Sequence, residues 1–522
     1  MAKSTSRNRT FRINNMTGLM NTMAEENAFL TLDPNARMGA GGITVPFEFK
    51  DVTNWMPLNR GGMSITFGYT LLKYVGSATK ITGLYRYIKS GGTSYFMVSY
   101  GSTLYTLSSG TLTSTTMSVT SGAYLDFETA YDKLIVCDGA GNVQTWDGTT
   151  VANLATGGDA TAVNGGRQSL FYANRLFIFS STHDTSLLYY SDGGNIATGY
   201  ASNFINCDVN DGQQITSISK FFIPGNLEPI IIVSKTRSVG VVTGDGTTAN
   251  PFTFSKISND LGVPGFRQIN QYQQDATFLT PRGVSSYRTA LQNNNIEQAL
   301  ISSKITNQFT SLPADKLPDA LSWFDWKNRR ITYAVTTGTN DYPDTLWHYD
   351  IELRGWYRQQ GFITTAAMVD TDGYVYTGTD DGKILKHDPE VFSYDGAIIS
   401  SRLETPYLDF YEPDHYKRII QGKVVCRGNG QYDLGMSTKI NYGLSTASSH
   451  NIPITTGAFT WGGGTWTSDP SVYQWGNAPI NRHKLYPGGI FENISFTFVN
   501  AAADQPVDLL EMTLEVEYLN LI

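Results

Sequence analysis

Leu134-Ile-Val-Cys-Asp-Gly-Ala-Gly-Asn-Val-Gln-Thr-Trp146 is one copy of a pattern that the chain repeats: an apolar strand, a polar turn and a second apolar strand. Seven such copies follow one another, and consecutive starts lie 38 to 54 residues apart. The copies begin near Phe96, Leu134, Leu176, Ile230, Thr277, Ile331 and Tyr374. A hairpin repeat of roughly 40–50 residues is typical of β-propeller blades, so the repeat predicts a propeller.

The composition favours the same fold class. The 522 residues include 51 Gly, 30 Tyr and 26 Phe, and only 16 % of the chain is charged. Aromatic residues suit strands and Gly suits tight turns, so we predict an all-β protein. A chain of this length is expected to contain about two or three domains.

We expect three parts along the chain. Residues 1–44 read as an N-terminal arm, with Lys3, Arg7, Arg9 and Arg12 before the first acid, Glu25. We expect this arm to be a tail or to pack on a neighbouring subunit, and its basic cluster gives only weak support for contact with nucleic acid.

Residues 45–395 are predicted to form a β-propeller of seven or eight blades. The sequence leaves open whether strands from both ends of this region close the ring. The apolar spacing of Ile296, Leu300, Ile301 and Ile305 predicts a short helix inside one blade connection. Residues 396–522 are predicted to form an antiparallel β-sandwich-like domain, because strands such as Leu510–Tyr518 alternate apolar and acidic side chains.

The charge and cysteine pattern argues against several function classes. A net charge of −8 does not fit a protein that binds nucleic acid by neutralising phosphates. Cys137, Cys207 and Cys426 are far apart and show no metal or disulfide spacing. We expect no cofactor, no signal peptide and no membrane insertion.

The sequence contains only incomplete matches to catalytic and metal-binding motifs. The six histidines form no zinc-binding motif, so we expect no metal site. Asp370-Thr-Asp372-Gly373 and Asp380-Asp381-Gly382 invite a calcium interpretation, but Asp-Gly is also a common hairpin turn. A propeller glycosidase needs two carboxylates across the sugar, and the candidate blade-top residues are Asp138, Asp147, Asp192 and Asp350. Because these aspartates recur in several blades, they favour turn architecture, and we expect no enzyme.

Several sequence segments, in their order along the chain, resemble segments of one protein family. They are Asn54–Met63, Gly166–Phe179, Leu188–Gly194, Ile230–Val242, Phe252–Gly262, Phe278–Gly283, Trp347–Asp350 with Gly355-Trp356, Phe491–Val499 and Leu509–Tyr518. Together they resemble the tail nozzle or packaged-DNA stabilisation (tail hub) proteins of short-tailed bacteriophages. The resemblance covers most of residues 45–520.

The resemblance implies a structural virion protein, made in the host bacterial cytoplasm and carried in the virion tail. Such proteins form a homo-oligomeric ring, typically a hexamer, below the portal and adaptor. They line the channel for double-stranded DNA, retain packaged DNA until ejection, and meet tail fibres and spike or needle proteins. The alternatives are a phage receptor-binding or fibre-attachment propeller and, third, a carbohydrate-active propeller enzyme.

Two loops are the candidate interface or gate segments, because loops on a rigid scaffold commonly carry binding. The first is Asn340, Asp341, Tyr342 and Pro343. The second is the Gly- and Trp-rich excursion with Trp461, Trp466 and Trp475, which suits either stacking on sugars or anchoring a protein interface.

Overall fold

A computed structural model describes most of the chain. The described residues are 8–13, 16, 19–21, 47–58, 61–209, 211–222, 230–259, 262–272, 275–289, 299–428, 431–455, 480–487, 489–500, 503–504 and 506–521. The chain divides into two compact units. The propeller unit contains Leu71–Trp347 and Phe362–His387, and the sandwich unit contains Met1–Thr70, His348–Gly361 and Asp388–Ile522.

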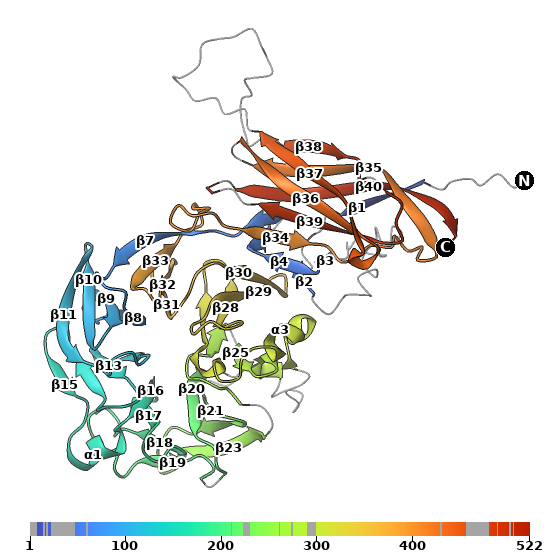
Figure 1. Ribbon diagram of the computed structural model, residues 1–522. Helices are drawn as coiled ribbons and strands as arrows, with labels where there is room; N and C mark the ends of the chain where they lie inside the picture. The colour runs from blue at the N-terminus through green and yellow to red at the C-terminus, as the bar shows by residue number, and fades with distance from the viewer. Residues whose placement is uncertain are drawn as a thin grey trace, which may run out of the picture. The chain divides into compact units, whose positions relative to one another are not determined.

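Six antiparallel sheets and the first three strands of a nine-stranded sheet form the propeller blades, here called blades 1 to 7 (Figure 1). Blade 1 consists of β8 (Ile81–Ile88), β9 (Ser94–Tyr100), β10 (Thr103–Ser108) and β11 (Thr111–Ser118), and blade 2 of β12 (Asp126–Ala130), β13 (Lys133–Cys137), β14 (Gln144–Trp146) and β15 (Val151–Asn153). Blade 3 consists of β16 (Gly166–Tyr172), β17 (Arg175–Ser180), β18 (Leu187–Tyr190) and β19 (Phe204–Asn206). Blade 4 consists of β20 (Ile215–Phe221), β21 (Ile230–Lys235), β22 (Val239–Thr243) and β23 (Thr253–Ser258). Blade 5 consists of β24 (Ile269–Tyr272), β25 (Asp275–Thr280) and β26 (Gly283–Ser286). Blade 6 begins with β27 (Leu321–Asp325), β28 (Arg330–Val335) and β29 (Thr345–Asp350), and blade 7 contains β31 (Ala366–Val369), β32 (Val375–Gly378), β33 (Lys383–His387) and β7 (Tyr69–Tyr74).

The first strands of the seven blades form a closed ring. Each contacts the first strand of the next blade in the order β8, β12, β16, β20, β24, β27 and β31, and β31 returns to β8. The all-β propeller predicted from the sequence is therefore confirmed, with seven blades. Each of the seven sequence copies forms the second and third strands of one blade, such as β13 and β14, where Leu134 pairs with Trp146.

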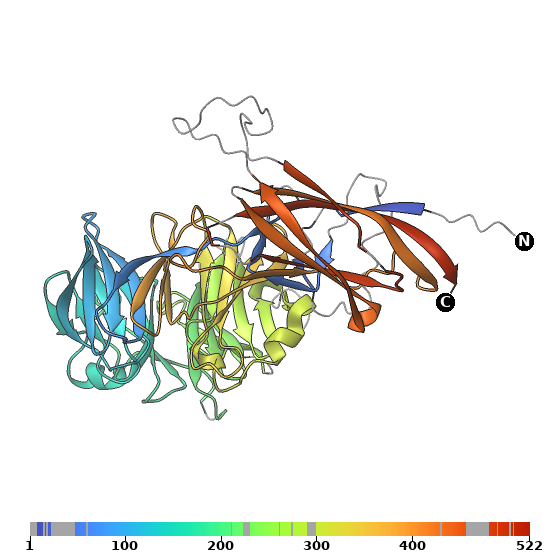
Figure 2. The ribbon, with the colours of Figure 1, turned by 45° about the horizontal axis from the view of Figure 1, so that its top comes forward.

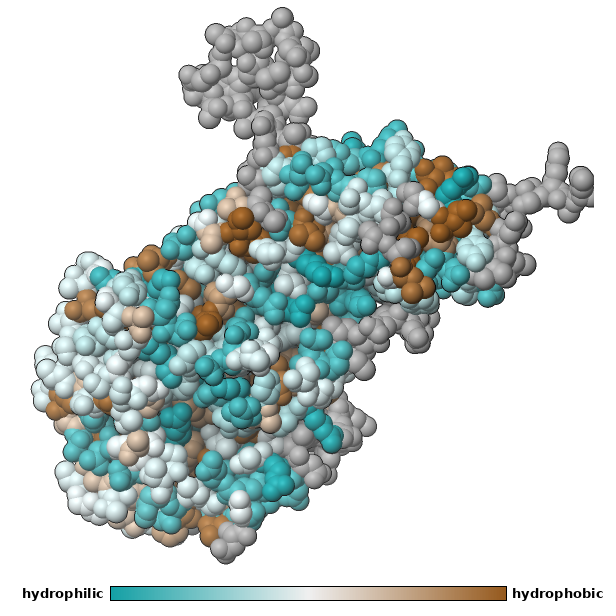
Figure 3. All heavy atoms as spheres, in the orientation of Figure 1, coloured by the Kyte–Doolittle hydropathy of each residue, from teal (hydrophilic) through white to brown (hydrophobic). Residues whose placement is uncertain are grey.

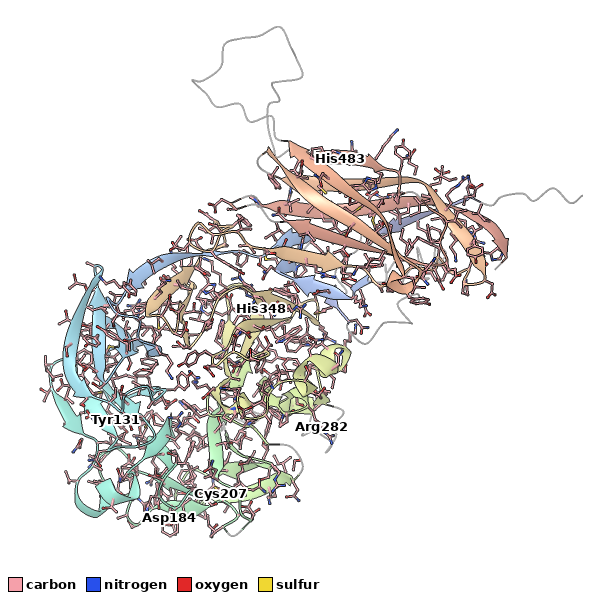
Figure 4. The ribbon with its side chains drawn as sticks, in the orientation of Figure 1. Tyr131, Asp184, Cys207, Arg282, His348 and His483 are labelled. Atoms are coloured by element: carbon pink, nitrogen blue, oxygen red, sulfur yellow. The ribbon has the colours of Figure 1, made fainter. Side chains whose placement is uncertain are left out.

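The core of the propeller lies between neighbouring blades. Tyr87 and Met97 of blade 1 pack with Leu134 and Trp146 of blade 2, and similar clusters join the following blades. Each sheet thus has two apolar faces, and each face needs a neighbour to bury it. Hydrogen bonds between turns add to this packing at one end of the ring. Tyr131, labelled in Figure 4, donates from its hydroxyl to Asn174 Oδ1 at 2.8 Å.

Blade 7 closes the ring with strands from both ends of the propeller sequence. β7 lies beside β33 as the outer strand, and the Val75 N–H donates to the Gly382 carbonyl at 3.0 Å. The chain fits there only with Gly382, because φ is +83° and a Cβ atom would lie 2.3 Å from the Ser77 carbonyl oxygen. On the inner side, Arg86 of β8 forms a two-point ion pair with Asp370, with Nε 2.8 Å from Oδ1.

We expect Arg86→Met to destabilise the propeller by about 3 kcal/mol, because it leaves the Asp370 carboxylate, whose side chain is 2 % exposed, without its charge partner. Urea unfolding of the purified protein measures this loss. The matched control is Lys383→Met in the same blade, which removes an ion pair to Asp381 whose two side chains are each 44 % exposed. That control should cost less than about 1 kcal/mol, and equal losses in the two variants would contradict a closing role for Arg86.

The sandwich unit contains two main sheets (Figure 2). One contains β1 (Asn8–Ile13), β5 (Trp55–Pro57), β6 (Met63–Ile65), β35 (His415–Gly428), β38 (Ile480–Leu485) and β40 (Val507–Leu521). The other consists of the remaining six strands of the nine-stranded sheet, which are β4 (Asp51–Thr53), β30 (Gly355–Gln360), β34 (Ser401–Glu404), β36 (Gln431–Ile440), β37 (Ser445–Thr455) and β39 (Ile494–Asn500). A short parallel pair joins β2 (Leu19–Met20) to β3 (Glu48–Phe49). The sheets approach closely: a Cβ atom at Gly428 of β35 would lie 2.4 Å from Ile454 Cγ2 of β37. The predicted antiparallel sandwich is present.

The predicted domain boundaries need correction. We expected residues 45–395 to form the propeller, but residues 47–58 and 61–70 and the segment His348–Gly361 belong to the sandwich unit. The physical reason is strand pairing: β4 pairs with β34, and β6 pairs with β40, so these short strands complete the C-terminal sheets.

The predicted N-terminal arm is also wrong for residues 8–13. These residues form β1, which pairs antiparallel with β40 from Asn8 opposite Glu517 to Ile13 opposite Met512. Phe11 is buried and its ring lies 4.9 Å from that of Phe410. Arg12 binds Glu511 at 2.6 Å and Arg9 binds Glu412 at 3.1 Å, so two of the basic residues have partners within the same unit.

We expect Phe11→Ala to lower the stability of the sandwich unit by about 3 kcal/mol, because it removes a buried ring and leaves a cavity. Hydrogen exchange followed by mass spectrometry should show faster exchange in β40 and unchanged exchange in blades 1 to 4. Thr10→Ala, an exposed position on the same strand, is the control. Unchanged protection of β40 in the Phe11 variant would contradict the pairing.

Helices are few and short among the described residues. α1 (Gly157–Ala162) precedes blade 3, and η4 (Ser303–Ile305), α3 (Thr306–Thr310) and η5 (Leu317–Asp319) lie between blades 5 and 6. η6 (Asn441–Gly443) follows β36. The helix predicted from Ile296 to Ile305 is found only in part, since the helical turns run from Ser303 to Thr310 and residues 290–298 lie outside the described residues.

Candidate functional site at the axial end of the propeller

One end of the propeller axis gathers charged and aromatic side chains from the places where the blades begin. Each blade starts with its innermost strand, so the residues just before or at the start of these strands share one end of the ring. We call Lys80, Tyr124, Arg167, Arg267 and Asp319 the entry cluster. They precede or begin β8, β12, β16, β24 and β27.

Arg267 reaches across the axis. Its Nη1 donates to the Thr365 carbonyl at 2.8 Å and its Nη2 donates to the Asp319 carbonyl at 2.7 Å. The guanidinium carbon also lies 3.8 Å from the centre of the Tyr124 ring. A side chain from blade 5 thus contacts the starts of blades 2, 6 and 7, which fixes them around the axis.

Arg167 lies beside it. Its Nη1 donates to the carbonyl oxygens of Tyr124 and Asp138, at 3.1 and 3.2 Å. Its guanidinium carbon lies 4.0 Å from the centre of the Phe266 ring, a cation–π distance. The two arginines therefore occupy this end of the propeller's own axis.

The predicted loop of Asn340, Asp341, Tyr342 and Pro343 lies next to the entry cluster. The Lys80 ammonium is 5.2 Å from the centre of the Tyr342 ring and 4.2 Å from that of Tyr124. The Pro343 carbonyl accepts the Thr364 N–H at 2.8 Å, just before β31 begins. Asp341 pairs with Lys316 at 2.9 Å, and Asn340 donates to Asp344. Trp461, Trp466 and Trp475 lie outside the described residues.

Burial shapes the electrostatics of the cluster. The pKa of Arg267 is lowered to about 10, chiefly by desolvation and also by the charge of Arg167, while Tyr124 and Asp319 oppose the shift. Desolvation also lowers the pKa of Lys80, against the attraction of Asp319. The pKa of the Tyr124 hydroxyl is raised to about 12 by burial. The lowered pKa values of Arg267 and Lys80 show that both cations are partly desolvated, and the carboxylate of Asp319 acts on both of them.

Asp126 lies further along the inner wall, on β12. Its Oδ2 accepts the Ser169 N–H at 2.8 Å and the Ser169 hydroxyl at 3.2 Å. Desolvation raises the pKa of this carboxyl to about 7, and the charge of Glu128 adds to the rise. Asp126 therefore carries a proton at mildly acidic pH.

The aspartates considered for catalysis serve their own turns. Asp138 accepts the N–H groups of Ala140 and Gly141 at 3.0 and 2.9 Å. Asp147 accepts those of Thr149 and Thr150, and Asp350 accepts those of Glu352 and Leu353. Asp192 accepts hydrogen bonds from Thr198 and Asn203.

The Asp-Gly segments have similar structural roles. Asp370 binds Arg86, Asp372 accepts the Tyr374 N–H at 2.9 Å, and Asp381 binds Lys383 at 2.5 Å. Among the described residues, no group of three or more His, Cys, Asp or Glu side chains is placed to hold a metal ion. No helix in the described part of the chain is long and apolar enough to cross a membrane.

The sequence did not point to the entry cluster itself. Arg167 and Arg267 follow Gly166 and Gly265-Phe266, and an Arg directly before or at the start of an inner strand is the only local signal. The contacts that define the cluster join residues of five different blades. Arg167 belongs to the segment Gly166–Phe179, which was singled out for the family resemblance and not as a site, and the neighbouring Tyr342 belongs to the predicted interface loop.

No family model matches the chain, and no curated protein matches it. Among solved structures, the extracellular domain of a putative one-component system from B. thetaiotaomicron aligns at 11 % identity and a TM-score of 0.39, over 64 % of this chain and 41 % of that one. YCF48 from Cyanidioschyzon merolae aligns at 12 % identity and a TM-score of 0.38, over 62 % and 99 %. The WD40 β-propeller domain of Doa1 aligns at 8 % identity and a TM-score of 0.38, over 62 % and 98 %. At these TM-scores the alignments say nothing of function, and the fold assignment rests on the strand pairing given above.

We expect Asp126→Asn to change how stability depends on pH. Because the folded-state pKa of about 7 lies above the ordinary carboxyl pKa of 3.8, ionisation of Asp126 is unfavourable in the folded state. Its contribution to the free energy of unfolding is therefore present below about pH 4 and falls as pH rises to 7. Melting temperatures from pH 4 to 8 at fixed ionic strength should move in favour of the variant as pH rises. Parallel curves for the two proteins would contradict the shift.

Proposed function

We propose that this protein is a structural virion component, a tail nozzle or hub subunit that assembles into a ring of copies around the DNA channel. The proposal starts from the sequence segments that, in their order along the chain, resemble those of the tail nozzle family. The structural observation that carries it is the set of large apolar side chains that the sandwich unit exposes.

These exposed side chains surround the turn after β36. Tyr442 and Leu444 are 62 % and 89 % exposed, and Ile490 is 57 % exposed. Asn441 and Glu492 hold this turn against the segment before β39, since the Glu492 N–H donates to Asn441 Oδ1 at 2.9 Å. We call Tyr442, Leu444 and Ile490 the turn patch. Figure 3 shows further apolar groups on the sandwich unit.

Exposed apolar clusters in otherwise polar proteins commonly mark protein interfaces. Tyr is also among the residues enriched at such interfaces. The turn patch therefore supports assembly with copies of this chain or with another tail protein.

The entry cluster limits where DNA could pass. Arg267 and Arg167 occupy one end of the propeller's own axis. A duplex would therefore run through the space enclosed by several copies and not through a single propeller. The net charge of −8 suits such a lumen, because a surface without a basic stripe does not retain DNA phosphates.

The use of aspartates in turns argues for the structural proposal over the carbohydrate-active one. Asp138, Asp147 and Asp350 are bonded to backbone N–H groups two or three residues further along the chain. A retaining or inverting glycosidase needs one carboxylic acid and one carboxylate facing the same bond. These three side chains instead close separate turns.

The test is the assembly state of the purified full-length protein. We expect mass photometry and negative-stain electron microscopy to show a six-fold ring with a central bore, formed alone or after addition of the adaptor protein. A protein that stays monomeric at every concentration and with adaptor present would overturn the proposal. Turnover on a glycan panel that is lost in an aspartate variant would favour the enzyme instead, and binding of the full-length chain to host surface glycan would favour the receptor-binding alternative.

We expect Leu444→Ser to weaken the ring by at least about tenfold in dissociation constant, because full burial of a Leu side chain is worth about 1.5–3 kcal/mol relative to leaving it exposed. Val209→Ser is the matched control, since Val209 is an exposed aliphatic residue of the propeller unit, outside the turn patch. Equal effects of the two substitutions would remove the turn patch from the interface.

A further inference from the structure

We propose that the entry cluster is a binding site for a small oxyanion, with Lys80 Nζ and the Tyr124 hydroxyl as its hydrogen-bond donors. The ligand class is an inorganic phosphate or a small carboxylate. This inference concerns the propeller unit alone and does not depend on the proposed virion function.

The first argument is that both donors are unused. The neighbours described for the Lys80 ammonium are the ring faces of Tyr124 and Tyr342, at 4.2 and 5.2 Å. Among the described residues, no hydrogen bond or ion pair of that ammonium is found. An ammonium carries three donors, and ring faces satisfy its charge without accepting those protons in hydrogen bonds of normal strength.

The second argument comes from Tyr124 itself. The residue is 6 % exposed, and no described residue accepts a hydrogen bond from its hydroxyl. The Arg267 guanidinium acts on this hydroxyl as a donor, which uses an oxygen lone pair and leaves the hydroxyl proton without an acceptor. A buried donor without an acceptor is destabilising, and such groups in folded proteins call for an explanation such as a bound ion. The same ring is in contact with both Lys80 and Arg267.

The third argument is the balance of charge. Lys80, Arg167 and Arg267 are cations, and Asp319 is the carboxylate whose field acts on all three. Asp126 and Asp138 act on Arg167. Two cations, Lys80 and Arg267, therefore share one carboxylate close to the Tyr124 ring. A bound anion would offset the excess positive charge, and in a partly desolvated position this attraction is stronger than in water.

The fourth argument is access. Lys80, Tyr342 and Asp319 are each partly exposed, so one side of the cluster meets solvent. Arg267 is bonded to backbone carbonyls on the inner side. An anion would enter from the side of Lys80 and the loop of residues 340–343, and the arginines would act through their field without leaving their backbone partners.

The alternative is that the cluster only fixes the blades. The Asp319 carboxylate would then be the sole anion needed, and the unused donors would face water. The two interpretations differ in one measurable respect, which is whether removing a donor changes anion affinity without changing the fold.

The experiment measures binding to the full-length protein by isothermal titration calorimetry. Inorganic phosphate and acetate are titrated at constant ionic strength maintained with sodium chloride. We expect saturable binding of at least one oxyanion. Lys80→Gln should weaken it at least about tenfold, because the bond lost is charge-assisted and worth roughly 1.5–3 kcal/mol. Lys80→Arg should retain binding, since it keeps a cation with hydrogen-bond donors at that position.

Tyr124→Phe separates binding from structure. It removes only the hydroxyl and keeps the ring between the cations, so the melting temperature should stay the same or rise while oxyanion affinity falls several-fold. Lys133→Gln, an exposed lysine of blade 2, is the control for the change in net charge.

Three results would overturn the proposal. One is that neither phosphate nor acetate binds beyond the effect of sodium chloride. Another is that Lys133→Gln weakens binding as much as Lys80→Gln does, which would indicate a nonspecific charge effect. The last is that Tyr124→Phe binds like the native protein. If Lys80→Gln does not fold, the comparison of Lys80→Arg with Tyr124→Phe still decides the question.

Discussion

The propeller depends on one constraint: each blade buries its two apolar faces only when both neighbours are present. Tyr87, Met97, Leu134 and Trp146 form one such layer, and the same arrangement recurs around the ring. The seventh gap is the critical one, because blade 7 is completed by β7, from the beginning of the propeller sequence. The Arg86–Asp370 ion pair and the hydrogen bond from the Thr365 hydroxyl to the Ile81 carbonyl lie at this junction. Cooperativity of the whole unit follows from this arrangement.

Closure of the ring also brings the side chains of the entry cluster together at one end of the axis. Seven inner strands bring seven strand starts to one end of the axis, where the guanidinium groups of Arg167 and Arg267 lie against the rings of Phe266 and Tyr124. Arginine can bridge several backbone carbonyls because its guanidinium has five donors in a plane. Filling an axis with cations carries an electrostatic cost, and the lowered pKa of Arg267 reflects it. Such a position favours anions, either Asp319 alone or a ligand.

The second and third strands of the blades could be predicted from the sequence because they are continuous apolar runs, such as Ile230–Val233. The inner strands were harder to find. β12 reads Asp-Phe-Glu-Thr-Ala, and its polar side chains form hydrogen bonds with the inner strands of the neighbouring blades, so it lacks the apolar run of a buried strand. β1 could not be assigned either, since its partner β40 lies about 500 residues away and nothing near Phe11 indicates that pairing. Turn chemistry was informative: the Asn and Pro of residues 340–343 marked a loop, and Tyr342 lies in contact with Lys80. The convergence of Tyr124, Arg167 and Arg267 follows from ring geometry, which no local pattern encodes.

The pairing of β1 with β40 has a consequence for biosynthesis. Glu517 is translated about 500 residues after its partner Asn8. At roughly 5–20 residues per second, translation leaves β1 without its partner for tens of seconds. The propeller unit ends at His387 and has all its strands well before that moment. A chain that stops early therefore carries a completed propeller but an open sheet edge at β1. Such an edge readily pairs with other chains. Only translation through β40 conceals it, so β40 distinguishes subunits with a paired β1 from those without one.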